Sequence, residues 1–525
     1  MTRRTIILLA GMAILWASSG AMLPAEGQLE FVAPTVDAPY YLIRASFEIP
    51  GPEISFNGVK LNDTEFRDFA LLKDGKPVDT SKLVGPGRYE IILRHAWVSN
   101  APYHVSIPTV APKQSWEAKT WEWRGIAPPF GGVPHPEEEG FFTPFVLEEG
   151  TGIERQGEIV YLTLTAPKTV LEGANLAVYD KEKRLPFQPL EMKESTPPES
   201  QAKTHPVTWT YKLAFPIDIK TRERKLLRVF KSTAGPVVPN AFTVSGENLG
   251  KTVQGERFTL RFHPQSGQIL TIEDAASGIK LYNKAGVIHW NPDVFTPGIA
   301  WDHSFDWNPP QAFNELSGAF LYLNARKGPM PHIRDVFLEV KYTVEKGAPY
   351  FLAETRMRVD KDLGVVALRN DEMVLYKELF DTIVYKNTRG AVVKKPLKEN
   401  PDTPFGLAHI APSDLEWVGL LNAKAGYGFF GLRLESSASN LDAAGTYLHR
   451  PGTYFYAPAD GDYVYWVRPW NYTWGEFATS NFLTALPAGT ILYEKNAYLV
   501  SRWSDATPAM LDALLKRLKN PVRVF

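Results

Sequence analysis

The chain contains no cysteine, and this absence removes several chemistries at once. Disulfide frameworks, thiol nucleophiles, cysteine zinc sites and iron–sulfur clusters all require cysteine. Any metal must therefore be held by His, Asp, Glu or Asn. The chain also lacks an excess of charge of one sign, because it has 57 Lys and Arg and 58 Asp and Glu, which give a formal net charge of −1. A nucleic-acid partner is disfavoured because it would call for a basic surface.

Several catalytic signatures are missing as well. The sequence has no G-x-S-x-G elbow, no P-loop, no H-E-x-x-H and no EF-hand loop. Each of these motifs supplies groups that its chemistry needs at a fixed spacing. Serine hydrolases of the usual type, nucleotide enzymes, zincins and that calcium module therefore lose support.

A long apolar run occurs only at the N-terminus, over residues 5–18. Arg3 and Arg4 precede it, small residues follow, and it is shorter than the roughly 20 residues of a membrane-spanning helix. This pattern predicts a signal peptide over residues 1–25. The mature chain is then expected in the periplasm or outside the cell, with no membrane span after signal removal.

The length of 525 residues predicts about three domains. With 44% hydrophobic and 12% aromatic residues the chain can bury sizeable cores, while 42 prolines argue against a helical array. We expect a mainly β protein, with small β-sandwich modules ahead of a large antiparallel supersandwich and a short C-terminal helix. The expected parts are a β-sandwich module over 28–112, a Pro/Gly-rich connector over 113–150, a second β-sandwich module over 151–235 and the supersandwich over 240–525.

The β modules are predicted from runs of alternating apolar residues that are separated by turns containing Gly and Pro. Short alternating runs at 41–47 and 89–94 predict strands of the first module. The clearest long strands are expected at 336–344 and 350–359. Helical spacing of leucines, with a proline at the first position, predicts a helix over 507–519.

One strand pair resembles a known group of proteins. Residues 258–262, the turn containing Gly267, residues 267–274 and then Gly278, preceded by the strand 213–219, look like the opening of the supersandwich of galactose-mutarotase-like carbohydrate-active enzymes. The resemblance is at superfamily level and covers about half of the chain. It implies a supersandwich fold and a carbohydrate-related role, as in polysaccharide lyases, glycoside hydrolases and sugar epimerases. It carries over no catalytic residue.

Aromatic residues gather in segments that also hold polar groups. Tryptophan faces stack on sugar rings, and histidines in such loops are suited to proton transfer. The segment 288–309 is the densest, with two His, three Asp, two Asn and three Trp. The candidate substrate-binding residues are Trp290, Trp301, Trp307, Asn308, Arg334, Arg468, Trp470 and Trp474. The candidate catalytic residues are His289, His303, Tyr465, Asp302 and Asp371.

Three functions remain open on these residues. A polysaccharide lyase acting on a uronate-containing glycan is favoured, because Arg334 or Arg468 with Asn291 or Asn308 can neutralise a carboxylate while a His or Tyr moves protons. A glycoside hydrolase or sugar epimerase would use carboxylates and a His, including Asp302, Asp371 and Glu372. A non-catalytic glycan-binding envelope protein would need the tryptophans alone. The expected partner is a polysaccharide or oligosaccharide, while a divalent metal held by His and Asp and the oligomeric state are left open.

Overall fold

The computed structural model is an almost entirely antiparallel β structure. It describes residues 28–33, 42–49, 53–56, 58–94, 102–110, 120–127, 138–172, 175–196, 207–232, 235, 238–284, 286–397, 408–410, 415–439, 452–458, 461–472 and 483–525. The expected signal peptide lies outside these residues. No helix among the described residues is long and apolar enough to cross a membrane. The chain divides into two compact units, residues 1–237 with 522–525, and residues 238–521.

The first sandwich of the N-terminal unit has two sheets. One sheet is ordered β1 (Glu30–Val32), β2 (Leu42–Ile49), β9 (Gly87–Arg94), β6 (Phe69–Lys73) and β7 (Lys76–Pro77), and the other β5 (Thr64–Phe66), β4 (Val59–Leu61), β10 (Pro102–Val110), β3 (Ile54–Phe56) and β8 (Leu83–Val84), with β11 (Thr120–Ile126) on β10. Alternate residues of β2, including Ile43 and Phe47, pack against Trp121 and Trp123 in one core. The period of two along a strand thus sets which side chains are buried.

The second sandwich of this unit is built in the same way. One sheet is ordered β15 (Lys183–Leu185), β14 (Asn175–Asp180), β18 (Arg224–Ser232), β12 (Glu138–Glu148) and β41 (Arg523–Val524), and the other β13 (Arg155–Pro167), β17 (Thr208–Ile219) and β16 (Gln188–Ser195), with the short helix α2 (Lys168–Leu171) after β13. The segment expected as a connector therefore contains two strands, β11 and β12, each of which extends a sheet. Strand β41 pairs with β12, and Val522 beside it lies in the core of this sandwich.

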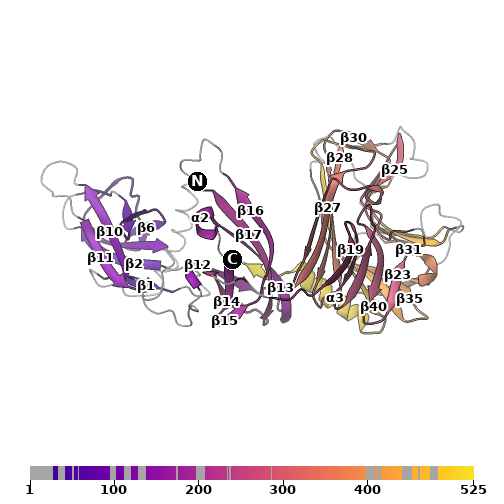
Figure 1. Cartoon of the computed structure of the whole chain (residues 1–525), viewed down its shortest axis with the longest axis horizontal. Coiled ribbons are helices and arrows are strands. Elements are labelled where there is room, and N and C mark those ends of the chain that lie inside the picture. The colour runs from indigo at the N-terminus through magenta and orange to yellow at the C-terminus, as the bar shows by residue number, and fades with distance from the viewer. Residues whose placement is uncertain are drawn as a thin grey trace. The chain divides into compact units, whose positions relative to one another are not determined.

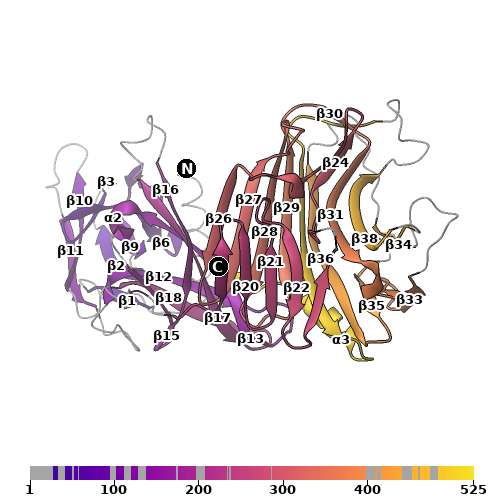
Figure 2. The same ribbon diagram turned by 45° about the vertical axis from the view of Figure 1, so that its right-hand side comes forward.

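The C-terminal unit has two main layers with one large core between them. A nine-stranded sheet forms one layer, and Figure 2 shows its strands β26 to β29 side by side. Its order is β26 (Ala312–Ser317), β27 (Leu321–Pro329), β28 (Val336–Glu345), β29 (Phe351–Val359), β40 (Ile491–Arg502), β36 (Tyr427–Ser439), β35 (Trp417–Asn422), β32 (Thr382–Lys386) and β33 (Val392–Pro396).

The other layer of this unit consists of smaller sheets. A five-stranded sheet is ordered β19 (Thr243–Glu247), β20 (Gly250–Gln254), β21 (Phe258–Phe262), β22 (Ile269–Asp274) and β23 (Ile279–Tyr282). A six-stranded sheet is ordered β25 (Ile299–His303), β24 (Asp293–Thr296), β31 (Ala367–Tyr376), β38 (Tyr463–Tyr472), β37 (Thr453–Tyr456) and β34 (Ala408–Ile410), and β30 (Leu363–Val365) pairs with β39 (Thr484–Leu486). Single 3₁₀ turns follow β25 (η2, Ser304–Asp306) and β31 (η3, Lys377–Leu379).

Helix α3 (Thr507–Lys519) covers part of the nine-stranded sheet on the face away from the main core (Figure 1). It starts with Pro508 in its first turn, where the missing backbone N–H costs nothing. Leu511 and Leu515 pack with Trp417 in a second core. Asp512 accepts hydrogen bonds from Trp417 Nε1 at 2.9 Å and Lys386 Nζ at 2.8 Å, which attach the helix to β35 and β32. The expected helix and the mainly β class are both confirmed.

Candidate functional site

An irregularity in strand β31 separates its polar residues. The pairing of β31 with β38 shifts register on both sides of Arg369. Asn370 and Asp371 consequently both reach towards the nine-stranded sheet, where they bind Thr355 of β29 and Tyr498 of β40. Arg369 and Glu372 bind each other and contact other residues of the six-stranded sheet. A bulge of this kind redirects side chains that strict alternation would place on opposite faces.

The inward-pointing group is a closed hydrogen-bond network. His289 is fully buried, with Nδ1 2.5 Å from the hydroxyl of Tyr342 and Nε2 3.0 Å from Oδ1 of Asp371. The other carboxylate oxygen of Asp371 accepts from Asn496 at 2.6 Å and from Tyr498. Burial raises the pKa of Tyr342 to about 12. Because both ring nitrogens of His289 are engaged and no part of it is exposed, this network is suited to holding the sheets together and to positioning its neighbours.

The outward-pointing group centres on an arginine bound by two carboxylates. Nε of Arg369 lies 2.9 Å from Oδ1 of Asp293, Nη2 binds Oδ2 of the same carboxylate, and Nη1 lies 2.6 Å from Glu372 Oε1. The ring of Trp301 lies 3.7 Å from the guanidinium carbon. Nδ1 of His303 is 2.8 Å from Oδ2 of Asp293. His303 and Arg369 retain slight exposure, whereas both carboxylates have none.

The two carboxylates of this group differ in their electrostatics. For Asp293, burial acts to raise the pKa, but Arg369 and His303 outweigh it and the pKa lies below its usual value. For Glu372, burial dominates over the attraction of Arg369, and the nearby charge of Asp293 adds to it, so the pKa rises to about 7. Two neighbouring carboxyls with opposite shifts are a frequent feature of sites that move protons.

The raised pKa of Glu372 predicts a dependence of stability on pH. The folded protein keeps this proton up to about pH 7, whereas the unfolded carboxyl loses it near 4.5. The folded state thus binds more protons in this window, and the free energy of unfolding should fall as the pH rises from 4.5 to about 7, by at most about 3 kcal/mol. Urea denaturation at several pH values should show a flatter profile for Glu372→Gln and an unchanged one for the exposed Glu273→Gln. An identical slope in Glu372→Gln would contradict this assignment.

Aromatic rings surround the slightly exposed histidine. Ring centroids of Trp290, Trp301 and Phe305 lie 5.4, 6.0 and 5.0 Å from that of His303. The ring of Tyr465 contacts the indole of Trp290 edge-on, with 6.0 Å between the ring centroids. All four aromatic residues are partly exposed. Burial, with the charge of Glu372 adding to it, raises the pKa of Tyr465 to about 12. We refer to His303, Trp290, Trp301, Phe305 and Tyr465 as the aromatic site.

The remaining predicted residues lie elsewhere. Asp302 is buried and accepts from the backbone N–H groups of His332 and Ile333, both at 2.8 Å, so it fixes the turn before β28. Trp307 lies in the main core and donates to the carbonyl of Pro329 at 2.7 Å. Asn308 and Arg334 are exposed. The backbone of Arg468 and Trp470 belongs to β38, but their side chains and all of Trp474 lie outside the described part of the chain.

Two residues at the site, Asp293 beside His303 and Phe305 in the aromatic site, are absent from the candidates predicted from the sequence. Asp293 is the first residue of strand β24 and follows a proline. A polar residue at that position predicts only the start of a strand and gives no sign of a functional role. The one available signal was its place between two histidines in the segment 288–309. Among the described residues, no group of three or more His, Asp and Glu side chains is arranged to hold a metal ion.

No protein-family model and no curated protein sequence matches the chain. Among solved structures, it is similar to an alpha-mannosidase from Enterococcus faecalis V583, with a TM-score of 0.46 and 10% identity over 73% of this chain and 46% of that one. It is also similar to a galactose mutarotase-like protein from Lactobacillus casei ATCC 334, with a TM-score of 0.30 and 9% identity over 50% of this chain and 100% of that one. The chain thus spans about half the length of the mannosidase. The group that the sequence resembles is represented among these structures.

Proposed function

We propose that the chain is a carbohydrate-active enzyme, and that it is a polysaccharide lyase cleaving a uronate-containing glycan by β-elimination. The observation that carries this proposal is the aromatic site, where His303 and Tyr465 both contact the ring of Trp290. Partly exposed indole and phenyl rings offer faces on which sugar rings stack. Two groups able to transfer protons then lie beside the same stacking surface.

The contacts of His303 suit it to act as the base. Its Nδ1 lies 2.8 Å from the carboxylate of Asp293, which favours the tautomer with the proton on Nδ1 and leaves a lone pair on Nε2. Asp293 in turn is held by Arg369, and its lowered pKa keeps it ionised. The pair is therefore ready to accept a proton and to stabilise the imidazolium that forms.

The pKa of Tyr465 suits it to act as the acid. At about 12, it leaves the phenol protonated at neutral pH, so that the hydroxyl can donate. In β-elimination, His303 takes the C5 proton, the C4–O bond breaks, a C4=C5 double bond forms, and the leaving oxygen accepts the proton of Tyr465. The uronate carboxylate must be neutralised during this step. Arg334 and Arg468 are the candidates, because the fork of Arg369 is already occupied by Asp293 and Glu372.

Hydrolysis by a pair of carboxylates receives less support. Such a pair must flank the glycosidic bond with room for the sugar and, in inverting enzymes, for a water molecule. Asp302 and Asp371 are both buried, and their oxygens accept hydrogen bonds from neighbouring residues. An epimerase would use the same His303 and Tyr465 and would differ in its product.

Product analysis tests the proposal. The purified chain is incubated with a panel of uronate polysaccharides, and the ultraviolet absorbance of the unsaturated product is followed beside the release of reducing ends. We expect both signals, with a rate about 100-fold lower in Tyr465→Phe. The matched control Tyr456→Phe removes the hydroxyl of the adjacent, more exposed ring, which lies 5.4 Å from Tyr465, and should retain the rate. Release of reducing ends without the rise in absorbance would indicate hydrolysis. Binding of a polysaccharide without either signal would indicate a glycan-binding protein.

A further inference from the structure

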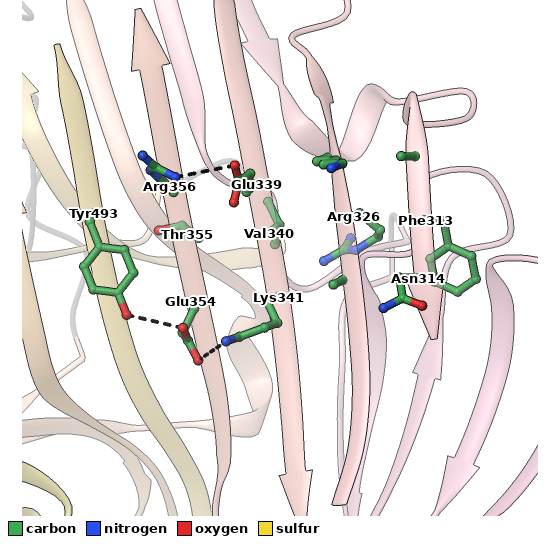
Figure 3. Close-up of a pocket in the computed structure, with 13 residues that line it drawn as sticks. Phe313, Asn314, Arg326, Glu339, Val340, Lys341, Glu354, Thr355, Arg356 and Tyr493 are labelled. Atoms are coloured by element: carbon green, nitrogen blue, oxygen red, sulfur yellow. Dashed lines mark hydrogen bonds and ion pairs between the residues drawn. The ribbon is translucent and has the colours of Figure 1, made fainter. Parts of the chain in front are cut away.

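A hollow lies on the nine-stranded sheet and contains none of the candidate site residues predicted from the sequence. It has a volume of about 330 Å³, within the usual range of small-ligand pockets. Strands β26, β27, β28, β29 and β40 line it with the residues Ala312, Phe313, Asn314, Ala325, Arg326, Lys327, Glu339, Val340, Lys341, Glu354, Thr355, Arg356 and Tyr493 (Figure 3).

Strand alternation places this hollow on the face turned away from the main core. On β28, Leu338, Val340 and Tyr342 lie in that core, so Glu339 and Lys341 between them point to the opposite face. The floor is formed where small residues face the same way. Ala325 pairs with Lys341 across the strands, and its methyl group leaves a depression among long side chains.

The same face of the sheet changes character along its strands. On β29, Leu352 packs beneath helix α3, whereas Glu354, two residues further on, lines the hollow. On β40, Leu499 lies under the helix and Tyr493 lines the hollow. Because the covered part is apolar and the hollow is charged, the hollow is suited to a polar ligand and poorly suited to a further packing element.

The polar groups of the hollow form an ordered row. Lys341 Nζ lies 2.8 Å from Glu354 Oε1, and the hydroxyl of Tyr493 donates to Oε2 at 3.3 Å, as Figure 3 shows. Arg356 and Glu339 form a looser pair at 3.7 Å. The lining holds two carboxylates, Glu339 and Glu354, and four cationic side chains, the other two being Arg326 and Lys327, so its net charge is positive. Among the described residues no ion pair joins Lys327 to an acid.

We propose that this hollow binds an acidic sugar unit, the class of ligand with many hydroxyls and one carboxylate. Alternating carboxylate and ammonium groups can accept hydrogen bonds from the neighbouring hydroxyls of a sugar and donate hydrogen bonds to them. The ring of Tyr493 offers an apolar face on which a sugar ring can stack. Lys327 is the group that meets the carboxylate. The proposal uses no residue of the aromatic site, so it holds whether or not the chain cleaves a glycan.

Titration calorimetry on the full chain tests this with trigalacturonate, the neutral trisaccharide maltotriose and sulfate as probes. The variant His303→Ala serves as the background so that no probe is consumed. We expect trigalacturonate to bind to a site that Ala325→Leu abolishes by filling the floor. Lys327→Gln should weaken this binding about tenfold, and raising the salt concentration should weaken it as well. Lys280→Gln, an exposed lysine on another sheet, is the matched control and should leave it unchanged.

The outcomes separate this proposal from the proposed function. Binding that Ala325→Leu and Lys327→Gln leave intact would overturn the site, and equal affinity for maltotriose or sulfate would overturn its ligand class. Since Lys327 is exposed, its replacement reports on binding even where Ala325→Leu fails to fold. Turnover of polysaccharide without this binding would overturn the hollow alone. Binding without any turnover would count against the lyase and leave the hollow standing.

Discussion

Replacement of His303 by alanine is expected to lower kcat/KM on a uronate polysaccharide by about 10²–10⁴-fold, the usual contribution of a general base. The imidazole contacts three rings of the aromatic site, and its Nδ1 lies 2.8 Å from Oδ2 of Asp293. The variant loses the proton acceptor and keeps the stacking surface. We therefore expect a loss in kcat with little change in KM, measured from initial rates.

A matched control separates this effect from general damage. His104 lies in the N-terminal unit beside Asp63 and Glu122. His104→Ala should keep the full rate. If His303→Ala were as active as His104→Ala, with both variants folded by circular dichroism, His303 would not be the base and the β-elimination mechanism would need another group.

Removal of the guanidinium in Arg369→Met should lower the free energy of unfolding by about 3–5 kcal/mol. The substitution leaves the ionised Asp293 fully buried without its cation, and it removes the hydrogen-bond donor of the buried Glu372. A buried charge that loses its partner retains its desolvation penalty, which makes this loss much larger than that of a surface pair. Urea denaturation followed by tryptophan fluorescence measures it.

The comparison variants make this prediction specific. Arg358→Met removes an exposed arginine that pairs with Asp360 on the same unit, and it should cost no more than about 1 kcal/mol. Adding Asp293→Asn to Arg369→Met should restore part of the loss, because the uncompensated charge of Asp293 disappears with the cation. Equal losses in Arg369→Met and Arg358→Met would mean that the buried cluster is solvated.

The regular parts of the fold could be predicted because local pattern and packing agree there. The pair of strands expected at 258–262 and 267–274 is observed as β21 and β22, and the helix expected at 507–519 is α3. In each, the period of the apolar residues matches the face that is buried. The strands of the segment 113–150 were missed, since proline and glycine dominate its composition while its pairing partners lie far away in the sequence.

The candidate site could be located from the sequence but not assembled. The concentration of His, Trp and Asp in 288–309 pointed to the strand carrying His303. Which of His289 and His303 faces outward depends on the register of β24, β25 and β31, and on the bulge around Arg369. One residue of shift exchanges the two faces of a strand. No local pattern encodes that shift, so Asp371 and Glu372 could not be assigned to different environments.

The pairing of β41 with β12 bears on how the protein acquires its structure. The partners are separated in the chain by the whole C-terminal unit, residues 238–521, so this contact is extremely non-local. Non-local contacts form slowly because a long loop must close before they gain any energy. During synthesis, β12 remains an edge strand of the second sandwich, with one side unpaired, until residues 238–521 and then β41 have been made. An unpaired edge of that kind invites pairing with other chains.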